Sequence, residues 1–475
     1  MIIKVHQLAA LVLWSGAAFV SAQSTRSVPD FTWFRSDVER ILTEELRHGE
    51  AHAILRDLCQ TAPKRLSGSK GMVEAVKWGE RTMKRLGFEN VHTEPCMVPH
   101  WERGKVARLT IVEPESLRGE TLTVTALGGS IGTAEGGTIA ELIEVASIGQ
   151  LRAMKKQPQG RIVFFNQPMD RTIIRTFQAY GGAARQRSRG AAEAAKKGAI
   201  AAITRSLTTR LDDIPHTGGM RYEDGVDKVP AAAVSTRGAE RLSALLGKHG
   251  RIVVRLELDC SWHENAPSAN VVGEWRGKDR PSEIILLGAH LDAWDLGEGA
   301  HDDGAGCAQV LEVLRLLMKL KLQPSRTIRV VLFSNEENGL AGGRAYLEAH
   351  KKEVTRHVFA LESDAGGFTP RGFSTNAGPD GLAWLRAAAQ LLRNAGASEV
   401  RAGGGGADIS PLGKFGVPLV GFMPDSARYF DLHHTSLDVF ESVHRRELEL
   451  GAACIAAMIY MIAETPRPFP RNPIR

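Results

Sequence analysis

The chain has few cysteines, and they follow no recognisable spacing. Its 475 residues include only five: Cys59, Cys96, Cys260, Cys307 and Cys454. No two of them are separated by two residues, the spacing typical of zinc-binding and redox motifs. Small secreted scaffolds held by disulfides contain far more cysteine for their length. The sequence therefore argues against a disulfide framework and a cysteine metal site, and it predicts buried thiols with at most one or two bridges.

Long apolar runs are also missing beyond the start of the chain. Residues 8–20 form an apolar run that follows a lysine and leads to the small residues Ser21 and Ala22. This run is shorter than the roughly 20 apolar residues that a membrane span needs. It predicts a signal peptide over residues 1–22, cleaved near Ala22. The mature protein is then expected to be exported, to the periplasm or the medium, with no membrane span.

The charge balance gives little sign of a nucleic-acid partner. The formal net charge is +6, which is mild for this length. The densest basic run, residues 185–189, has no aromatic residues interleaved with it, and no helix-turn-helix, zinc-finger or RNA-binding motif accompanies it. This run is interpreted as a solvated face, and no nucleic-acid partner is expected.

The length predicts two domains, or one domain with a large insert. Residues 125–260 have the texture of a separate αβ module, with an apolar strand at 160–167 and a small-residue helix running into a strand at 190–206. This module has no cluster of ligand-type residues. His216 is its one exposed-looking histidine, for which a structural role in a loop is favoured over a substrate contact. The main domain is then expected to comprise residues 23–124 and 261–475.

The second half of the chain alternates apolar strands with helices. The strands are expected at residues 283–289, 327–334, 357–363 and 418–425. Strands alternating with helices are typical of a mostly parallel sheet covered on both faces. The predicted fold class is therefore α/β, with a doubly wound, mostly parallel sheet and an inserted αβ domain.

Each of these strands is followed by carboxylate or imidazole side chains. In open α/β sheets, ligands bind at the carboxyl ends of the strands, so these side chains are expected to meet. They are, in chain order, His290, Asp292, Asp302, Asp303, Glu336, Glu337, Asp364, His433 and His434. One polar strand end means little, but four in succession are hard to ascribe to the polarity of loops.

Such a set fits two zinc ions that share one carboxylate. Zinc takes histidine nitrogen and carboxylate oxygen, and two ions about 3.5–4 Å apart can clamp both sides of a displacement. The predicted ligands of the two ions are His290 and Asp364 for one, Glu337 and His434 for the other, with Asp302 between them. Asp292 is close enough in sequence to His290 to hold its second ring nitrogen. Glu336 is the predicted general base.

The residues alone leave several of these choices open. Asp303 could replace Asp302, and His433 could replace His434. Asp295 and His301 could be ligands, although capping or lining the loop is favoured for both. Asp408, after the glycines at 403–406, could bind a substrate amine or cap a turn with equal weight.

At these motifs the sequence resembles the di-zinc exopeptidases of family M28. The resemblance rests on "HLDAWDLGEGAHDDGAG", "NEENG", "ESDAGG" and "LHHTSLD", and extends through "VPHWERG", "SIGT", "NQP", "GAAEAAKKGA" and "PHTG". It covers almost the whole mature chain, and its inserted module resembles a protease-associated domain.

The resemblance implies roles for single positions. It puts the bridging role on Asp302, the base on Glu336, and metal binding on Glu337 and Asp364. It favours His434, which is followed by Thr435 and Asp438, over His433. It also implies a secreted homodimer that binds two zinc ions per chain.

The expected activity is hydrolysis of dipeptides or short peptides. The alternative is an aminopeptidase that releases N-terminal residues. A non-catalytic binding protein and a one-zinc glutaminyl cyclase are disfavoured, because the ligand set is complete and Glu336 adjoins Glu337.

Overall fold

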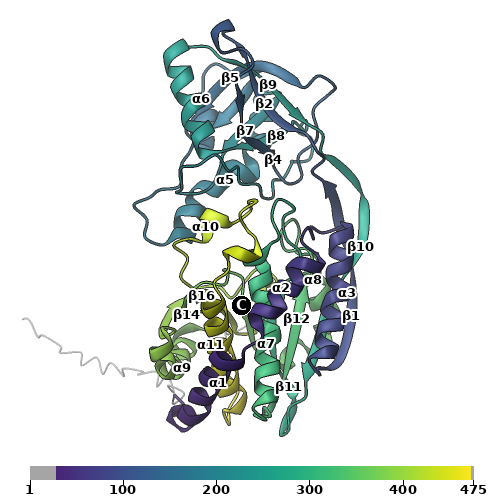
Figure 1. The fold of residues 1–475 in the computed structure, drawn as a ribbon, viewed down its shortest axis with the longest axis vertical. Coiled ribbons are helices and arrows are strands. Elements are labelled where there is room, and N and C mark those ends of the chain that lie inside the picture. Colours follow the sequence, from purple (N-terminus) through teal and green to yellow (C-terminus); the bar gives the residue numbers. More distant parts are fainter. Residues whose placement is uncertain (1–27, 472–475) are drawn as a thin grey trace, which may run out of the picture.

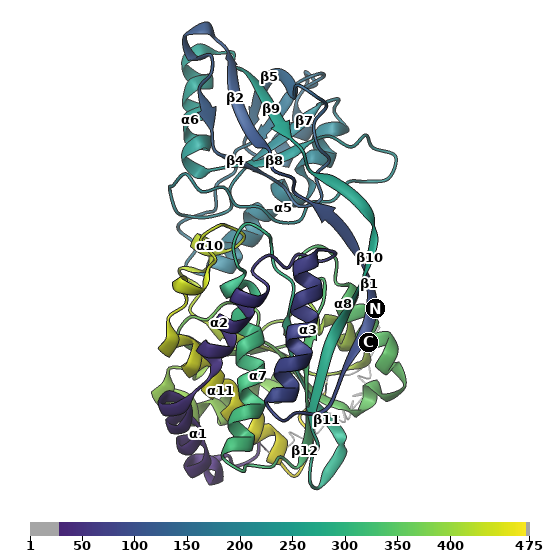
Figure 2. The ribbon, with the colours of Figure 1, turned by 45° about the vertical axis from the view of Figure 1, so that its right-hand side comes forward.

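The computed structural model describes residues 28–471. The predicted signal peptide and its cleavage near Ala22 therefore lie outside the described residues. Two sheets lie one above the other, and the long strands β1 and β10 run from the lower one towards the upper one (Figure 1, Figure 2). The lower sheet comprises, in spatial order, β1 (Glu89–Glu102), β10 (Ser261–Trp275), β12 (Arg326–Phe333), β11 (Arg280–His290), β13 (His357–Glu362), β16 (Leu419–Pro424), β14 (Pro370–Thr375) and β15 (Glu399–Ala402).

The centre of the lower sheet is parallel, as predicted. β11 pairs in parallel with β12 and β13, and β13 pairs in parallel with β16. The antiparallel pairs lie towards the edges, where β10 joins β12 and β14 joins β16. Strands buried on both faces are apolar along their whole length, which is why residues 284–289 show no polar alternation.

Helices cover both faces of this sheet. Leu287 and Ala289 face a core shared with the larger helical layer, whereas Leu286 faces α8 (Ala341–His350). The larger layer comprises α1 (Arg35–His48), α2 (Ala51–Thr61), α3 (Lys70–Arg85), α7 (Ala305–Lys319), α9 (Gly378–Ala389) and α11 (Arg445–Glu464). No helix within residues 28–471 is long and apolar enough to cross a bilayer.

The upper sheet forms the inserted domain. It comprises β3 (Thr121–Leu122), β2 (Ala107–Glu113), β9 (Val253–Leu258), β5 (Thr138–Val145), β6 (Ile162–Phe165), β7 (Ala201–Arg205), β8 (Ala231–Val234) and β4 (Val124–Ala126). α6 (Thr236–His249) packs on one face, and α4 (Ile148–Ala153) and α5 (Thr176–Ala195) pack on the other. Because β2 pairs with β9, this sheet includes residues before position 125, where the sequence placed the boundary.

The two domains meet at α5 and α10 (Tyr429–Leu432), which lie next to each other in both views (Figure 1, Figure 2). The Tyr180 ring of α5 stacks on the Phe430 ring of α10 with centroids 4.6 Å apart. Phe177 stacks on Tyr429 at 5.1 Å. Aromatic contacts of this size bury much apolar surface, so they anchor the inserted domain above the lower sheet.

Short helices and irregular turns make up most of the remaining structure. They are η1 (Thr32–Phe34), η2 (Glu115–Leu117), η3 (Ala300–Gly304), η4 (Lys351–Arg356), η5 (Gln390–Ala395), η6 (Ser410–Phe415) and η7 (Phe440–Ser442). The backbone of η3 leaves helical geometry at Asp302 and Asp303. All five cysteines are free thiols, and Cys96 alone among them is not fully buried.

Candidate metal centre

The predicted ligands meet at the carboxyl end of the parallel strands. His290 is the last residue of β11, Asp364 follows β13, and Glu337 follows β12. Asp302 lies in η3, between β11 and α7, and His434 lies just after α10. Since parallel strands end at the same edge of a sheet, these loops converge over that edge.

Asp302 is shared by two sets of side chains. Its Oδ1 lies 3.2 Å from His290 Nε2, which is also 3.5 Å from Asp364 Oδ1. Its Oδ2 lies 3.2 Å from His434 Nε2, which is also 3.2 Å from Glu337 Oε2. The two oxygens of one carboxylate therefore face two separate groups, each with one imidazole and one further carboxylate.

These residues fit a pair of zinc ions. Four ligands at about 2.0–2.1 Å in a tetrahedron are separated from one another by about 3.4 Å, close to the distances within each set. Glu337 Oε1 is buried and has no hydrogen-bond partner within residues 28–471. Imidazole nitrogen with carboxylate oxygen is a donor set typical of zinc. The arrangement can hold two ions with Asp302 between them.

The carboxylates of this centre are buried close together, and their pKa values are shifted as a result. Burial, followed by the charge of Asp302, raises the pKa of Glu337 to about 7. Burial also raises the pKa of Asp364. Burial acts in the same direction on Asp302, but hydrogen bonds from His290 and His434 outweigh it and hold the pKa of Asp302 well below its usual range. Bound divalent cations would offset the repulsion within this group.

The alternatives within each pair differ in their contacts, although Asp302, His433 and His434 together also form a group that could hold a metal ion. Asp303 Oδ2 accepts a hydrogen bond from the His290 backbone N–H, and its Oδ1 accepts one from Gly306. Asp303 is therefore engaged with the backbone. His433 Nε2 is 3.7 Å from Asp302 Oδ2, farther than His434 Nε2, and its ring stacks on that of His434 at 3.5 Å. The distances favour Asp302 and His434.

Asp292 acts differently from the prediction. His290 Nδ1 lies 2.9 Å from the Asp292 backbone carbonyl, whereas the Asp292 carboxylate is 3.9 Å away. That carboxylate accepts hydrogen bonds from the backbone N–H groups of Glu336 and Glu337, at 2.9 Å and 3.4 Å, and from Ser67 Oγ. Its side chain therefore positions the Glu336–Glu337 segment, and its main chain orients the histidine ring.

Asp295 and His301 bind to other groups. Asp295 forms an ion pair with Arg103, with Oδ1 2.6 Å from Nη2. The His301 ring stacks on Phe368, and its Nδ1 accepts a hydrogen bond from Gly367 N–H. Both therefore stabilise the loops around the centre.

His216 and Asp408 are both buried. His216 Nδ1 is 3.0 Å from the His433 backbone carbonyl, so this histidine supports the segment that carries His434. Neither carboxylate oxygen of Asp408 has a hydrogen-bond partner within the described residues, and therefore the side chain caps no turn there. Burial, followed by the charge of Glu362, raises the pKa of Asp408 well above its usual range.

A pocket of about 450 Å³ opens over the centre and is walled by both domains. From the lower domain it is lined by Asp302, Glu336, Glu337, Asp364, Tyr429 and His434, and from the inserted domain by Tyr180, Arg187, Gly219 and Met220. Its volume is in the range of ordinary small-molecule sites. The substrate of such a site would touch the inserted domain as well as the metal ligands.

Arg187 is a site residue that the sequence did not identify. It belongs to the basic run at 185–189 that was interpreted as a solvated face. Arg185 and Arg189 are exposed, but the guanidinium of Arg187 is partly buried over the Tyr180 ring, 5.4 Å from its centroid. Its Nε has no hydrogen-bond partner, and no carboxylate within residues 28–471 pairs with it. The helical period of α5 turns one arginine of the run inward, which a charge count does not detect.

Comparisons with known proteins identify the family of the chain. Residues 270–459 match peptidase family M28. The chain is 33% identical over 470 residues to carboxypeptidase Q of Mus musculus, an alignment that covers 97% of both chains. The chain belongs to peptidase family M28.

Solved structures show the same fold. The peptidase M28 precursor from Shewanella amazonensis SB2B is 34% identical, with a TM-score of 0.89 over 93% of this chain and 100% of that one. BSAP, a zinc aminopeptidase from Bacillus subtilis, shares the fold at 19% identity, with a TM-score of 0.62 over 87% of this chain and 94% of that one. The M28 protein described here is a zinc metallopeptidase, as the resemblance implied.

Proposed function

We propose that the protein is an exopeptidase that hydrolyses dipeptides or short peptides with two zinc ions per chain. His290 and Asp364 would hold one ion, Glu337 and His434 the other, and Asp302 both. One observation carries this proposal: the two carboxylate oxygens of Asp302 face two different imidazole–carboxylate sets. One oxygen lies 3.2 Å from His290 Nε2, and the other lies 3.2 Å from His434 Nε2. A carboxylate shared by two such sets supports two metal positions rather than one.

The chemistry needs a base, and the position of Glu336 in the pocket supports this residue for the role. Zinc ions in such a centre polarise a scissile carbonyl and lower the pKa of water. Glu336 lines the pocket beside the ligand Glu337, and its backbone N–H is fixed by Asp292 Oδ1 at 2.9 Å. Its carboxylate would take a proton from the attacking water and return it to the leaving amine.

Arg187 favours a substrate with a free carboxylate. A partly buried guanidinium without a carboxylate partner costs free energy unless the ligand supplies the anion. Arginine binds carboxylates through two parallel hydrogen bonds. Because Arg187 shares the pocket with Glu336 and Asp302, the C-terminal carboxylate of a dipeptide could reach it while the peptide bond lies at the centre. Support for the aminopeptidase alternative comes from the fold shared with BSAP.

The test combines metal content with a panel of dipeptides whose ends are free or blocked. Two zincs per chain that are lost in Asp302→Ala, together with cleavage only where the C-terminus is free, would support the proposal. Two zincs with cleavage of C-terminally amidated substrates would instead indicate an aminopeptidase. One zinc or none, with no hydrolysis, would overturn the di-zinc proposal and favour a cyclase or a binding protein.

We also propose export and a homodimer on the sequence resemblance. Both can be measured independently of the activity. The N-terminal residue of protein recovered from the periplasm or medium gives the cleavage site. Light scattering of the mature protein gives its oligomeric state.

A further inference from the structure

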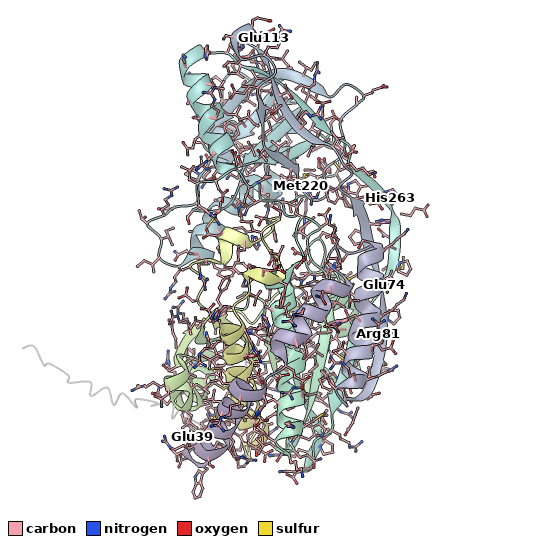
Figure 3. The ribbon with its side chains drawn as sticks, in the orientation of Figure 1. Glu39, Glu74, Arg81, Glu113, Met220 and His263 are labelled. Carbon is pink, nitrogen blue, oxygen red and sulfur yellow. The ribbon has the colours of Figure 1, made fainter. Side chains whose placement is uncertain are left out.

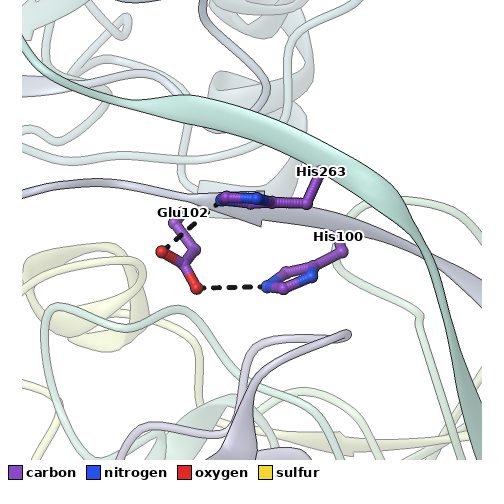
Figure 4. A group of neighbouring side chains, drawn as sticks. All are labelled: His100, Glu102 and His263. Atoms are coloured by element: carbon purple, nitrogen blue, oxygen red, sulfur yellow. Dashed lines mark hydrogen bonds and ion pairs between the residues drawn. The ribbon is translucent and has the colours of Figure 1, made fainter.

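A second group of metal-type side chains lies on the strands that join the two domains. His100 and Glu102 are on β1, and His263 is on β10, directly opposite His100 in the antiparallel register. Glu102 Oε1 is 3.2 Å from His100 Nε2, and Glu102 Oε2 is 3.5 Å from His263 Nε2. Figure 4 shows the three side chains close together, with a dashed line from the Glu102 carboxylate to each of the two rings.

We propose that His100, Glu102 and His263 form an accessory site for a zinc ion. Their ligand atoms all lie within 4.8 Å of one another. The separations of 3.2 Å and 3.5 Å again match the roughly 3.4 Å between ligands in a zinc tetrahedron. Two imidazoles and one carboxylate leave a fourth position for water. Imidazole donors favour zinc and related transition ions over magnesium and calcium, which prefer oxygen.

The pairing of β1 with β10 brings these three side chains together. Residues two apart on a strand share a face, and a cross-strand neighbour lies about 5 Å away on that same face. His100 and Glu102 satisfy the first relation, and His263 satisfies the second. The ring centroids of His100 and His263 are 4.6 Å apart. Binding would therefore require small side-chain rotations, with no change of backbone.

The position of the site links it to the pocket wall. The neighbours of the histidines, Trp101 and Trp262, also oppose each other in the register. Trp101 Nε1 donates a hydrogen bond to the Ser130 carbonyl at 2.8 Å, and Trp262 Nε1 donates to the Gly129 carbonyl at 2.9 Å. Trp262 and Gly129 line the pocket. An ion that ties β1 to β10 here would steady the strands at the point where the inserted domain meets the lower one.

Zinc stoichiometry tests the proposal on the holoenzyme. The protein is dialysed against buffered micromolar free zinc, and metal per chain is measured by mass spectrometry. We expect His263→Ala and Glu102→Gln each to hold one zinc fewer than the unmodified protein. His48→Ala is the matched control: His48 is exposed and lies 3.2 Å from Glu44, but it belongs to no group of three metal-type side chains within residues 28–471. It should bind as much zinc as the unmodified protein.

Equal zinc contents in all four proteins would overturn the proposal. The comparison is a difference between variants, so it stands whether the centre at Asp302 holds two zincs or one. Thermal unfolding gives a second readout, because an ion that binds only the folded state raises the melting temperature. Added zinc should raise it by a few degrees in the unmodified protein and in His48→Ala. If zinc raised the melting temperatures of His263→Ala and Glu102→Gln by the same amount, this result would also count against the site.

Discussion

Arg187 Nη1, on α5 of the inserted domain, lies 3.4 Å from Nδ1 of His434, which follows α10 in the lower domain. This contact joins the inserted domain to the metal centre. Both domains therefore line the same pocket, and the inserted domain contributes the positive charge of Arg187. The first prediction concerns that charge.

Replacing Arg187 by alanine should weaken binding of substrates with a free C-terminus. A hydrogen bond to a charged group contributes about 1.5–3 kcal/mol, so KM should rise by roughly 10- to 100-fold. Any residual turnover of C-terminally amidated substrates should show little change. Arg185→Ala, which removes an exposed arginine of the same helix, is the control and should leave both substrate classes unaffected. Equal losses on free and amidated substrates would instead place Arg187 in support of the metal centre.

Glu336→Gln should abolish most turnover while keeping the metal. The amide preserves the shape of the side chain but cannot accept the proton, and general-base catalysis contributes about 10²- to 10⁴-fold. We expect kcat to fall by that factor with zinc content unchanged. Steady-state kinetics and metal analysis on the same preparation provide the check. A variant with unaltered kcat would remove Glu336 from this role.

The two adjacent histidines should differ in what they do to the metal. His434→Ala removes an imidazole that lies 3.2 Å from both Asp302 and Glu337, so zinc content should drop by one per chain. His433→Ala is the matched control, because His433 lies farther from Asp302 and stacks on the same ring. It should keep its zinc. The opposite result would exchange the roles of the two residues.

Glu45 should make stability fall as pH rises. Burial, followed by the neighbouring Glu312 carboxylate, raises the pKa of Glu45 from its ordinary value of 4.5 to about 11. The folded state therefore binds this proton more tightly than the unfolded state. Its contribution to stability is complete below pH 4.5 and is lost as pH rises towards 11, at no more than about 1.4 kcal/mol per pH unit.

Glu45→Gln keeps a neutral side chain at every pH and tests this effect. Its melting temperature should exceed that of the unmodified protein by an amount that grows between pH 5 and pH 8. Glu39→Gln makes the same substitution at an exposed position on the same helix and serves as the control (Figure 3). A constant difference across this pH range would contradict the assignment.

The sequence alone predicted the parallel sheet and the ligands at its edge. Continuous apolar runs such as residues 284–289 indicate strands covered on both faces, and polar residues directly after them must reach the same edge. That rule is enough to bring His290, Glu337 and Asp364 together. The resemblance to family M28 then selected Asp302 and His434 from their neighbours.

Only the tertiary structure decided the rest. The Asp303 carboxylate accepts hydrogen bonds from backbone N–H groups, whereas the Asp302 carboxylate faces the histidines. This difference follows from the irregular turn of the chain at η3, which the spacing of the two residues in the sequence does not predict. Arg187 reaches the centre because the inserted domain docks through aromatic contacts between α5 and α10.

The accessory site was likewise not predictable from the sequence alone. His100 and His263 are 163 positions apart in the chain and become neighbours through the register of β1 and β10. Local patterns determine which faces are apolar and where strands end, because these depend on neighbours in the chain. Contacts between distant segments depend on how the domains pack, and that is a property of the whole fold.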